Sequence, residues 1–475
     1  MIDNRMGDSG MEDNWIQDNR MEDNGMKDKE DYLSTLNERQ LDAITTTEGY
    51  VRIIAGAGTG KTKALTHRYA YLVNELGIST SNILCVTFTN KAAREMSKRI
   101  RQMIGDSDTG YICTFHGFCV KLLREDIHAI NFPQNFVVMD DEDTEEILKT
   151  VYENAHIQSR TYTFDSARDH ITAMKSQMLH IPYLAEIGNE KLLADYEKAE
   201  KVEDKVFLGY LYEQKKVYGL DYDDLITIAL YILQTDETKR IKWQERMMYV
   251  MVDEFQDVSN SQYALAEILS GYHRNLFIVG DPDQTIYTWR GAQIEYILEF
   301  DETHENTRTI FLDMNYRSTP EILAVSNSLI EKNKKRLPHR LEAYKESGRR
   351  PIYIHSRTTG DEAQWMTSEI QRLVSEGVSY NEMAVLYRSY FVSRNIEESF
   401  IKAKIPYTLY SGVEFYKRKE IKDVLAYLRM IVYSDDLSFR RVINEPKRNF
   451  GKKRMALVKA YAESHRCSLY NGLLD

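Results

Sequence analysis

The chain has 475 residues and a formal net charge of −11, with 28% charged and 43% hydrophobic residues. Its length suggests about three domains. Its acidity excludes a global basic field for nucleic acid, although a local basic groove lined with aromatics can still hold a single strand. No apolar run reaches the ~20 residues of a membrane span, and no signal peptide opens the chain. The four cysteines lack zinc-like spacing, so we expect reduced thiols in a cytoplasmic protein without a membrane partner.

The N-terminal segment repeats Asp/Glu-Asn units without apolar periodicity, which predicts a disordered acidic tail over residues 1–30. Such a tail is either dispensable or binds a partner. Folded sequence begins at Leu33, and Ser34 or Thr35 is expected to cap a helix over LNERQLDAI. Gln40 in this helix carries an amide that can pair with an adenine edge, and the alternative is a plain helix-surface glutamine.

The segment VRIIAGAGTGKT (residues 51–62) combines a buried strand, a glycine-rich turn, Lys61 and Thr62, and a helical pattern follows it. This is the order of a phosphate-binding loop, in which glycines let backbone N–H groups approach a polyphosphate. Lys61 can neutralise phosphates, and the Thr62 hydroxyl can ligate Mg²⁺. The alternative is a structural strand–helix turn with a surface lysine. The candidate loop residues are Ala55, Gly56, Ala57, Gly58, Thr59, Gly60, Lys61 and Thr62, with Ala55 where the strict pattern has glycine.

Two more strand-to-helix junctions follow the phosphate loop. Phe88 and Asn90 come after a predicted strand over residues 83–87, and Phe115 and His116 come after the strand-like YICT. Ligands of open α/β sheets gather at the carboxyl ends of the strands. An aromatic ring beside small polar residues suits a nucleic-acid strand there. The alternative interpretation is that both phenylalanines belong to the core.

Residues 118–218 have a charged helical pattern without a chemical motif, and we expect a helical insertion there. The segment DYDDLITIALYIL then returns the chain to the α/β domain. For Asp223 and Asp224 we favour helix capping over catalysis.

The segment MMYVMVDEFQDVS predicts a buried strand that ends in Asp253 and Glu254. Adjacent acids at the end of a buried strand are costly unless they have a function. Next to a phosphate loop, Asp253 would hold Mg²⁺ and Glu254 would orient the attacking water. The alternative is an acidic surface turn.

A further predicted strand continues into LFIVGDPDQTIYTWRGA. Gln284 follows the turn, where its amide can reach a γ-phosphate. Tyr287, Trp289 and Arg290 come directly after it and form a candidate base-stacking platform. One segment can therefore touch both nucleotide and strand.

The segment TIFLDMNYRSTPEIL predicts the start of a second α/β unit, with a helix beginning at Thr319-Pro320. Arg317 follows its strand, where a guanidinium can bind phosphate oxygens. Further strands are expected over residues 351–357 and 383–390, and Tyr387 and Arg388 lie at the end of the latter. Beyond residue 415 the pattern is helical.

In this order, the segments resemble the motifs of the UvrD/Rep/PcrA group of superfamily 1 DNA helicases. The matching segments are LNERQ, AGAGTGKT, TFTNKAA, TFHGF, DYDDL, VDEFQD, VGDPDQTIYTWRGA, NYRS, VLYRS and GVEFYKRKEIKDVLAYLR. The resemblance implies an α/β P-loop NTPase with two RecA-like parallel-sheet domains that carry helical insertions. The expected first domain covers residues 31–117 and 219–290, the incomplete second covers 291–415, and a second insertion starts over 416–475.

The resemblance also implies roles for the site residues. Gln40, Tyr316 and Lys63 would bind adenine, and Gln284 and Arg317 would sense the γ-phosphate of ATP. Members of the family move 3′ to 5′ on single-stranded DNA and open 3′-tailed duplexes. The residues implied to contact DNA are Phe88, Asn90, Phe115, His116, Tyr287, Trp289, Arg290, Tyr387 and Arg388.

Two features depart from the family pattern. Relatives often have arginine at Lys63, and a lysine lacks the planar stacking face. The family's later motifs, including the second arginine finger, are absent, which suggests a truncated product. The chain would then be a helicase, an ATP- and single-strand-binding module without productive unwinding, or one half of a site that a protein partner completes.

Overall fold

The computed structural model describes residues 32–105, 108–389, 392–410 and 419–474. The chain forms two compact units, Met1–Arg349 and Arg350–Asp475. The predicted acidic tail lies outside the described residues. None of the helices in these ranges is long and apolar enough to cross a membrane.

The first unit is built on a six-stranded parallel sheet with the strand order β3-β2-β6-β7-β1-β8. Its strands are β1 (Tyr50–Ala55), β2 (Ile83–Val86), β3 (Tyr111–Cys113), β6 (Tyr249–Val252), β7 (Leu276–Gly280) and β8 (Arg308–Leu312). In the centre of the sheet, Ile53 of β1 is in register with Val279 of β7 and Ile310 of β8. The apolar, β-branched runs form strands because helices bury both faces of the sheet.

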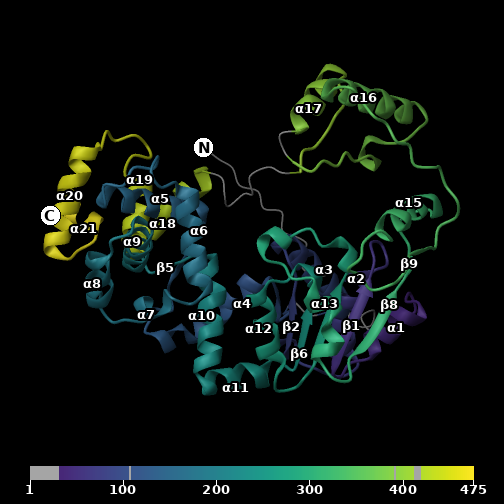
Figure 1. Cartoon of the computed structure of the whole chain (residues 1–475), viewed down its shortest axis with the longest axis horizontal. Helices are drawn as coiled ribbons and strands as arrows, with labels where there is room; N and C mark the ends of the chain where they lie inside the picture. Colours follow the sequence, from purple (N-terminus) through teal and green to yellow (C-terminus); the bar gives the residue numbers. More distant parts are fainter. Residues whose placement is uncertain (1–31, 106–107, 390–391, 411–418, 475) are drawn as a thin grey trace, which may run out of the picture. The chain divides into compact units, whose positions relative to one another are not determined.

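Helices cover the two faces of the sheet, as Figure 1 shows for the first unit. One face packs on α1 (Glu38–Thr45), α2 (Lys61–Asn74) and α3 (Asn90–Ile104); the other packs on α4 (Phe115–Asp126), α10 (Tyr222–Thr235), α11 (Glu237–Arg246) and α12 (Asn260–Ser270). Neighbouring residues of β1 show the division, because Ile53 joins the first core and Ile54 the second. The α/β P-loop fold predicted from the sequence is therefore confirmed.

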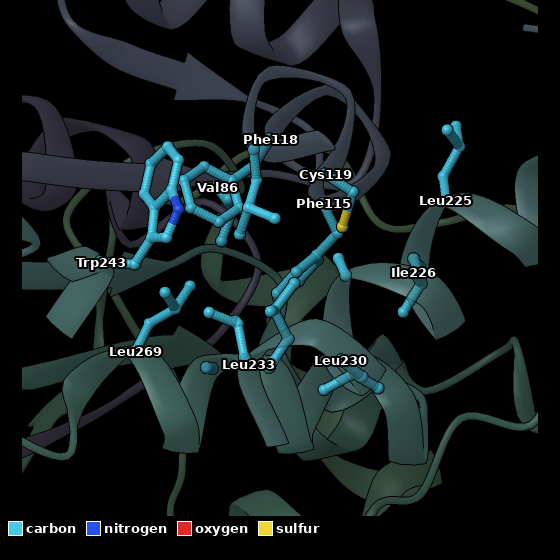
Figure 2. Close-up of a cluster of buried hydrophobic side chains, with 14 of the residues drawn as sticks. Val86, Phe115, Phe118, Cys119, Leu225, Ile226, Leu230, Leu233, Trp243 and Leu269 are labelled. Atoms are coloured by element: carbon cyan, nitrogen blue, oxygen red, sulfur yellow. The ribbon is translucent and has the colours of Figure 1, made fainter. Parts of the chain in front are cut away.

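The second core is rich in aromatic rings (Figure 2). Trp243 of α11 and Phe118 of α4 meet edge to face, with ring centroids 5.5 Å apart. Leu230 and Leu233 of α10 complete the cluster. Because Phe118 and its neighbours are fully buried here, α4 belongs to the α/β core. The predicted insertion, residues 118–218, therefore begins later than expected.

The insertion is framed by a short parallel pair, β4 (Val137–Val138) and β5 (Gly219–Leu220). Between them lie α5 (Asp141–Asn154), α6 (Phe164–Ser176), α7 (Ile181–Leu184), α8 (Glu190–Lys198) and α9 (Val202–Lys216). The predicted helical character of this segment is confirmed.

A buried ion cluster joins the insertion to α10. Asp221 caps α10 in a reciprocal capping box with Asp224, so the capping interpretation is confirmed for Asp224. Asp223 instead accepts a hydrogen bond from Thr172 Oγ1. Nζ of Lys175, a side chain of α6 with no exposed surface, lies 2.5 Å from Asp221 and 2.8 Å from Asp224. Burial, with the nearby Asp221 charge, raises the pKa of Asp224, and Lys175 opposes that rise. The DYDDL turn is thus a joint between two parts of the first unit.

The strand over TIFL differs from its prediction. It was expected to start a second sheet, but β8 pairs in parallel with β1. Ile310 and Leu312 point into the same core as β1, and this burial places the strand in the first sheet. The chain then continues through the short parallel pair β9 (Met314–Asn315) and β10 (Glu342–Ala343), with α15 (Pro320–Ile330) beginning after Thr319 as predicted.

In the second unit, residues 351–357 and 383–389 form no strand, contrary to expectation. Leu386 is 93% exposed, and neither segment has a neighbouring strand among the described residues to pair its N–H and C=O groups. The described elements are helices: α16 (Thr359–Ser375), α17 (Ser393–Lys402), α18 (Lys419–Tyr433), α19 (Asp436–Val442), α20 (Lys452–His465) and α21 (Leu469–Leu474). The predicted helical character beyond residue 415 is confirmed from Lys419 onward.

Candidate nucleotide and nucleic-acid site

All six parallel strands end at one edge of the sheet, so the strand order decides which side chains meet there. His116 and Phe88 follow β3 and β2, at one end of this edge. The phosphate loop after β1 and the turn after β8 lie at the other end. Asp253 and Glu254 follow β6, between the two groups.

The phosphate loop is held by its carbonyl groups. Gly58 and Gly60 have φ of 76° and 94°, which a side chain would strain. Three successive loop carbonyls accept hydrogen bonds from outside the loop. The bonds run from Asn315 Nδ2 to Ala57 O (2.5 Å), from Tyr316 N to Gly58 O (2.9 Å) and from Gln40 Nε2 to Thr59 O (3.0 Å).

The N–H groups of the same loop remain available. Those of Gly58, Gly60, Lys61 and Thr62 donate to no acceptor in the described chain. With carbonyls directed outward and N–H groups free at the start of α2, the loop suits a polyphosphate.

The acidic end of β6 touches the phosphate loop. Nζ of Lys61 lies 3.0 Å from Oε2 of Glu254. The same oxygen accepts a hydrogen bond of 3.0 Å from Nε2 of Gln256, a side chain only 2% exposed. Lys61 is therefore next to negative charge, and Gln256 directs the Glu254 carboxylate from the protein side.

Asp253 is buried and incompletely bonded. Thr87 Oγ1 donates to one carboxylate oxygen at 3.2 Å, and the other, Oδ1, has no hydrogen-bond partner in the described chain. Burial, with the charge of Glu254, raises the pKa of Asp253 to about 6. A buried carboxylate oxygen without a donor suits a hard divalent cation. Asp253 and the Thr62 hydroxyl are the side chains that would hold Mg²⁺.

Gln256 also connects the end of β6 to the end of β7. Its Oε1 accepts the N–H of Asp281 at 3.0 Å. Asp281 in turn accepts a hydrogen bond from the exposed Gln284 amide through its carboxylate. The segment that continues to Tyr287 is therefore connected through Gln256 to Glu254, the candidate general base.

The predicted adenine residues surround the start of α1. The N-cap of α1 is Asn37, further along the chain than the predicted Ser34 or Thr35, because Asn37 and Gln40 form a capping box. Asn37 Nδ2 donates to the Tyr316 hydroxyl at 2.7 Å. Gln40 is buried on the phosphate loop, with one amide hydrogen and one oxygen lone pair left over for a base. Lys63 Nζ donates to Thr35 O at 2.7 Å.

An aromatic patch, defined as Phe88, Tyr287 and Trp289, joins the ends of β2 and β7. The rings of Phe88 and Tyr287 stack with centroids 4.9 Å apart and planes at 25°. Trp289 lies 6.3 Å from Tyr287 and is 65% exposed. Arg290 ends the same turn, and its side chain lies outside the described part of the structure. The patch offers faces for bases.

Phe115 does not share this exposure. It is 7% exposed and packs in the second core, so its ring has no free face for a base (Figure 2). The alternative interpretation, in which the phenylalanine belongs to the core, is therefore correct for Phe115. His116 instead meets Tyr222 edge to face at 5.5 Å, and burial lowers its pKa. Asn90 is exposed at the first turn of α3.

The remaining predicted site residues lie after β8 and in the second unit. Arg317 is exposed in the first unit, and its Cβ would lie only 2.7 Å from a Cβ added at Gly58. In the second unit, Tyr387 packs against the small core around Phe400 and Arg388 is exposed. The structure thus brings Arg317 to the phosphate loop and describes Tyr387 and Arg388 separately.

Comparison with known proteins agrees with this arrangement. The model of the UvrD/REP helicase N-terminal domain matches residues 36–305, more than half of the chain. The chain belongs to the UvrD/REP helicase family. The model of the UvrD-like helicase C-terminal domain matches residues 310–470. The predicted resemblance is confirmed.

Relatives within the family include the ATP-dependent DNA helicase PcrA of Staphylococcus aureus (strain Mu50), 39% identical over 443 residues. PcrA of Staphylococcus epidermidis (strain ATCC 12228) is 39% identical over 445 residues. Each match covers 93% of this chain and 60% of the relative. The chain therefore spans about 60% of the length of the curated relatives that it matches.

Sequence reasoning did not single out three residues that the structure places in contact with the candidates. Asn315 holds the loop carbonyl of Ala57, and its Oδ1 accepts the N–H groups of Arg317 and Ser318. Gln256 holds Glu254, and Asn37 holds Tyr316. For Asn315 a local signal was available, because an asparagine side chain frequently bonds the backbone two residues on. The contacts of Gln256 with Asp281 and of Asn37 with Tyr316 join distant segments and have no such signal.

Proposed function

We propose that this chain hydrolyses ATP and couples hydrolysis to 3′-to-5′ movement on single-stranded DNA, as a UvrD-type helicase or translocase in DNA repair or replication. One continuous path of contacts carries the proposal. Glu254 bonds Gln256, which bonds the backbone of Asp281, and that segment leads to Tyr287 stacked on Phe88. A change at the nucleotide end can therefore move the aromatic patch.

At the ATP end of this path, each group has a proposed role. The N–H groups of the phosphate loop and the Lys61 ammonium bind the phosphates, while Gln40, Tyr316 and Lys63 bind the base. Thr62 and Asp253 hold Mg²⁺, which neutralises phosphate charge when bound. Glu254 orients and deprotonates the attacking water. Gln284 and Arg317 contact the γ-phosphate and stabilise the charge that develops on it.

The DNA end uses stacking and polar contacts. Phe88, Tyr287 and Trp289 stack on bases of a single strand, or of the 3′ tail of a duplex. Asn90, His116 and Arg290 contact the backbone beside them. In the second unit, Tyr387 and Arg388 are further candidates for contact with DNA. Phe115 is left out because it is a core residue.

A second candidate is an ATP- and single-strand-binding module without productive unwinding. It is favoured by the second unit, where the segments 351–357 and 383–389 pair with no strand among the described residues. A protein partner that supplies strands and an arginine finger would convert such a module into a motor.

An ATPase assay with and without single-stranded DNA tests the proposal. DNA should stimulate hydrolysis, Lys61→Ala should abolish nucleotide binding, and Glu254→Gln should keep binding but lower kcat by roughly 100-fold or more. Lys198→Ala, on the exposed end of α8, is the control and should behave as wild type.

A strand-displacement assay then separates the two candidates. Unwinding of a 3′-tailed but not a 5′-tailed duplex supports the motor. DNA binding and nucleotide binding without stimulated hydrolysis supports the module, and absence of nucleotide binding overturns both.

A further inference from the structure

Helix α3 carries a row of cations on one side. We define the basic stripe as Lys91, Arg94, Lys98 and Arg101, which follow one another at i, i+3, i+7 and i+10. At about 100° per residue, this spacing keeps all four within an arc of about 80°. The opposite side of α3 is buried against the sheet through Met96 and Ile100. The basic stripe therefore lies on the side of α3 that faces solvent.

The stripe is exposed and unpaired. All four of its side chains are exposed, and none forms an ion pair within the part of the chain that the structure describes. Glu95 is the one acidic residue of α3, and it pairs with no basic neighbour there. In a chain with a net charge of −11, four adjacent cations without acidic partners are a local exception. Basic side chains gathered along one helix face are the electrostatic footprint of polyanion binding.

The position of the stripe indicates the kind of polyanion. Thr89 caps α3 directly after Phe88, whose ring stacks on Tyr287. The stripe thus starts one helical turn from the aromatic patch. From Lys91 to Arg101 the helix rises about 15 Å, which is long enough to lie along several successive phosphates of one strand. A negatively charged protein surface would satisfy the charge but would not explain why the stripe continues from base-stacking rings.

We propose that the basic stripe of α3 binds phosphate groups of the DNA strand that leaves the aromatic patch. This inference rests on the proposed function, because it assumes that a strand is held at Phe88 and Tyr287. It extends the DNA contact along the outer side of α3, from Lys91 in the TFTNKAA segment to Arg94, Lys98 and Arg101 beyond it. The stripe acts through charge alone, so its contribution is independent of base sequence and sensitive to salt.

Binding of labelled oligothymidylates to the full chain tests the proposal by fluorescence anisotropy over a range of salt concentrations. An oligonucleotide of about 6 nucleotides fills the aromatic patch, and one of about 20 also reaches the stripe. The quadruple variant K91Q/R94Q/K98Q/R101Q should bind the long oligonucleotide at least about tenfold more weakly at moderate salt. Its salt slope should fall by about 2–3, at about 0.7 per phosphate contact, while the short oligonucleotide is bound as by wild type.

A charge-matched control removes the same number of cations from the insertion, as K191Q/K198Q/K201Q/K205Q. It should keep the wild-type affinity and salt slope for both oligonucleotides, and thermal unfolding checks that both variants fold. An unchanged salt slope in the α3 variant, or an equal loss of affinity in the control variant, contradicts DNA binding by the basic stripe. The proposed function still stands in that case if DNA stimulates ATP hydrolysis by the wild-type chain. A wild-type chain that binds neither oligonucleotide overturns the proposed function itself.

Discussion

Oε2 of Glu254 lies 3.0 Å from the Lys61 ammonium and accepts a hydrogen bond from the Gln256 amide at the same distance. The backbone of Glu254 has φ of 48°, in the left-handed region that costs a non-glycine residue about 1–2 kcal/mol. The two contacts stabilise this conformation from the loop side and from the protein side. The direction of the Glu254 carboxylate is therefore set by Lys61 and Gln256, which belong to motifs far apart in the sequence.

Replacing Gln256 by alanine should lower catalysis more than binding. The change removes the buried donor to Glu254 and leaves the Asp281 N–H without its acceptor. We expect kcat for DNA-stimulated hydrolysis to fall by roughly 10–100-fold with little change in KM for ATP. Gln244→Ala, which removes a half-buried amide bonded to Ile268 O, is the control. A raised KM with unchanged kcat would contradict the positioning role.

Gly58→Ala should weaken nucleotide binding, and Gly77→Ala should not. Both glycines have positive φ, 76° and 66°, so both variants carry a similar backbone strain of about 1 kcal/mol. A Cβ at position 58 would lie 2.7 Å from Cβ of Arg317, whereas nothing lies within 4 Å at position 77. We expect at least a tenfold loss of affinity for a fluorescent ATP analogue in the first variant alone. Equal losses would show that strain, not the contact with Arg317, matters.

The stacked pair Phe88 and Tyr287 should behave as one unit in DNA binding. Each alanine variant is expected to weaken single-strand binding by about 1–3 kcal/mol. Because the rings touch, the double variant should lose less than the two single losses combined. Tyr272→Ala, at a 57% exposed ring elsewhere in the first unit, is the control. Strict additivity in the double-mutant cycle would argue against a shared platform.

Lys175→Met should destabilise the first unit strongly. The change leaves the carboxylates of Asp221 and Asp224 buried without their cation, and we expect the free energy of unfolding to fall by about 3–5 kcal/mol. Lys149→Met removes an exposed partner of Glu145 four residues away and should cost about 0.5 kcal/mol or less. Urea unfolding measures both, and similar effects for the two variants would refute the joint formed by the DYDDL turn.

His304 should make stability depend on pH above about 6.5. Burial disfavours its charged form, but the Glu267 carboxylate, 2.9 Å from Nε2, outweighs burial and raises the pKa of His304. The folded chain then binds the proton more tightly than the unfolded chain. The resulting stabilisation is fully present below the unfolded pKa of about 6.5 and is lost as pH rises through the higher folded pKa.

The comparison of two histidine variants isolates this effect. His304→Asn should remove the loss of stability that begins as pH rises above about 6.5, measured by urea unfolding at several pH values. His273→Asn, at a half-buried ring bonded to a backbone carbonyl, is the control and should leave the contribution of His304 in place. A wild-type slope in the His304 variant would contradict the ion pair with Glu267.

Several elements could be predicted because short sequence patterns specify them. The strand before the phosphate loop, the cap at Thr89 and the helix start at Pro320 depend on short patterns of apolar, capping and proline residues. The strand over TIFL was predicted correctly as a strand but assigned to the wrong sheet. Its partner β1 lies more than 250 residues earlier in the chain, and no local pattern reports such a pairing.

By itself, the sequence determined the family, the α/β class and the chemical types at each strand end, since these depend on residue identity and spacing. Only the tertiary structure decided how the strand ends are ordered along the edge of the sheet. That order stacks Phe88 on Tyr287, buries Phe115 and brings Asn315 onto the phosphate loop. The physical reason is that parallel pairing and burial are contacts between distant segments, so they select one arrangement among several that the local sequence allows.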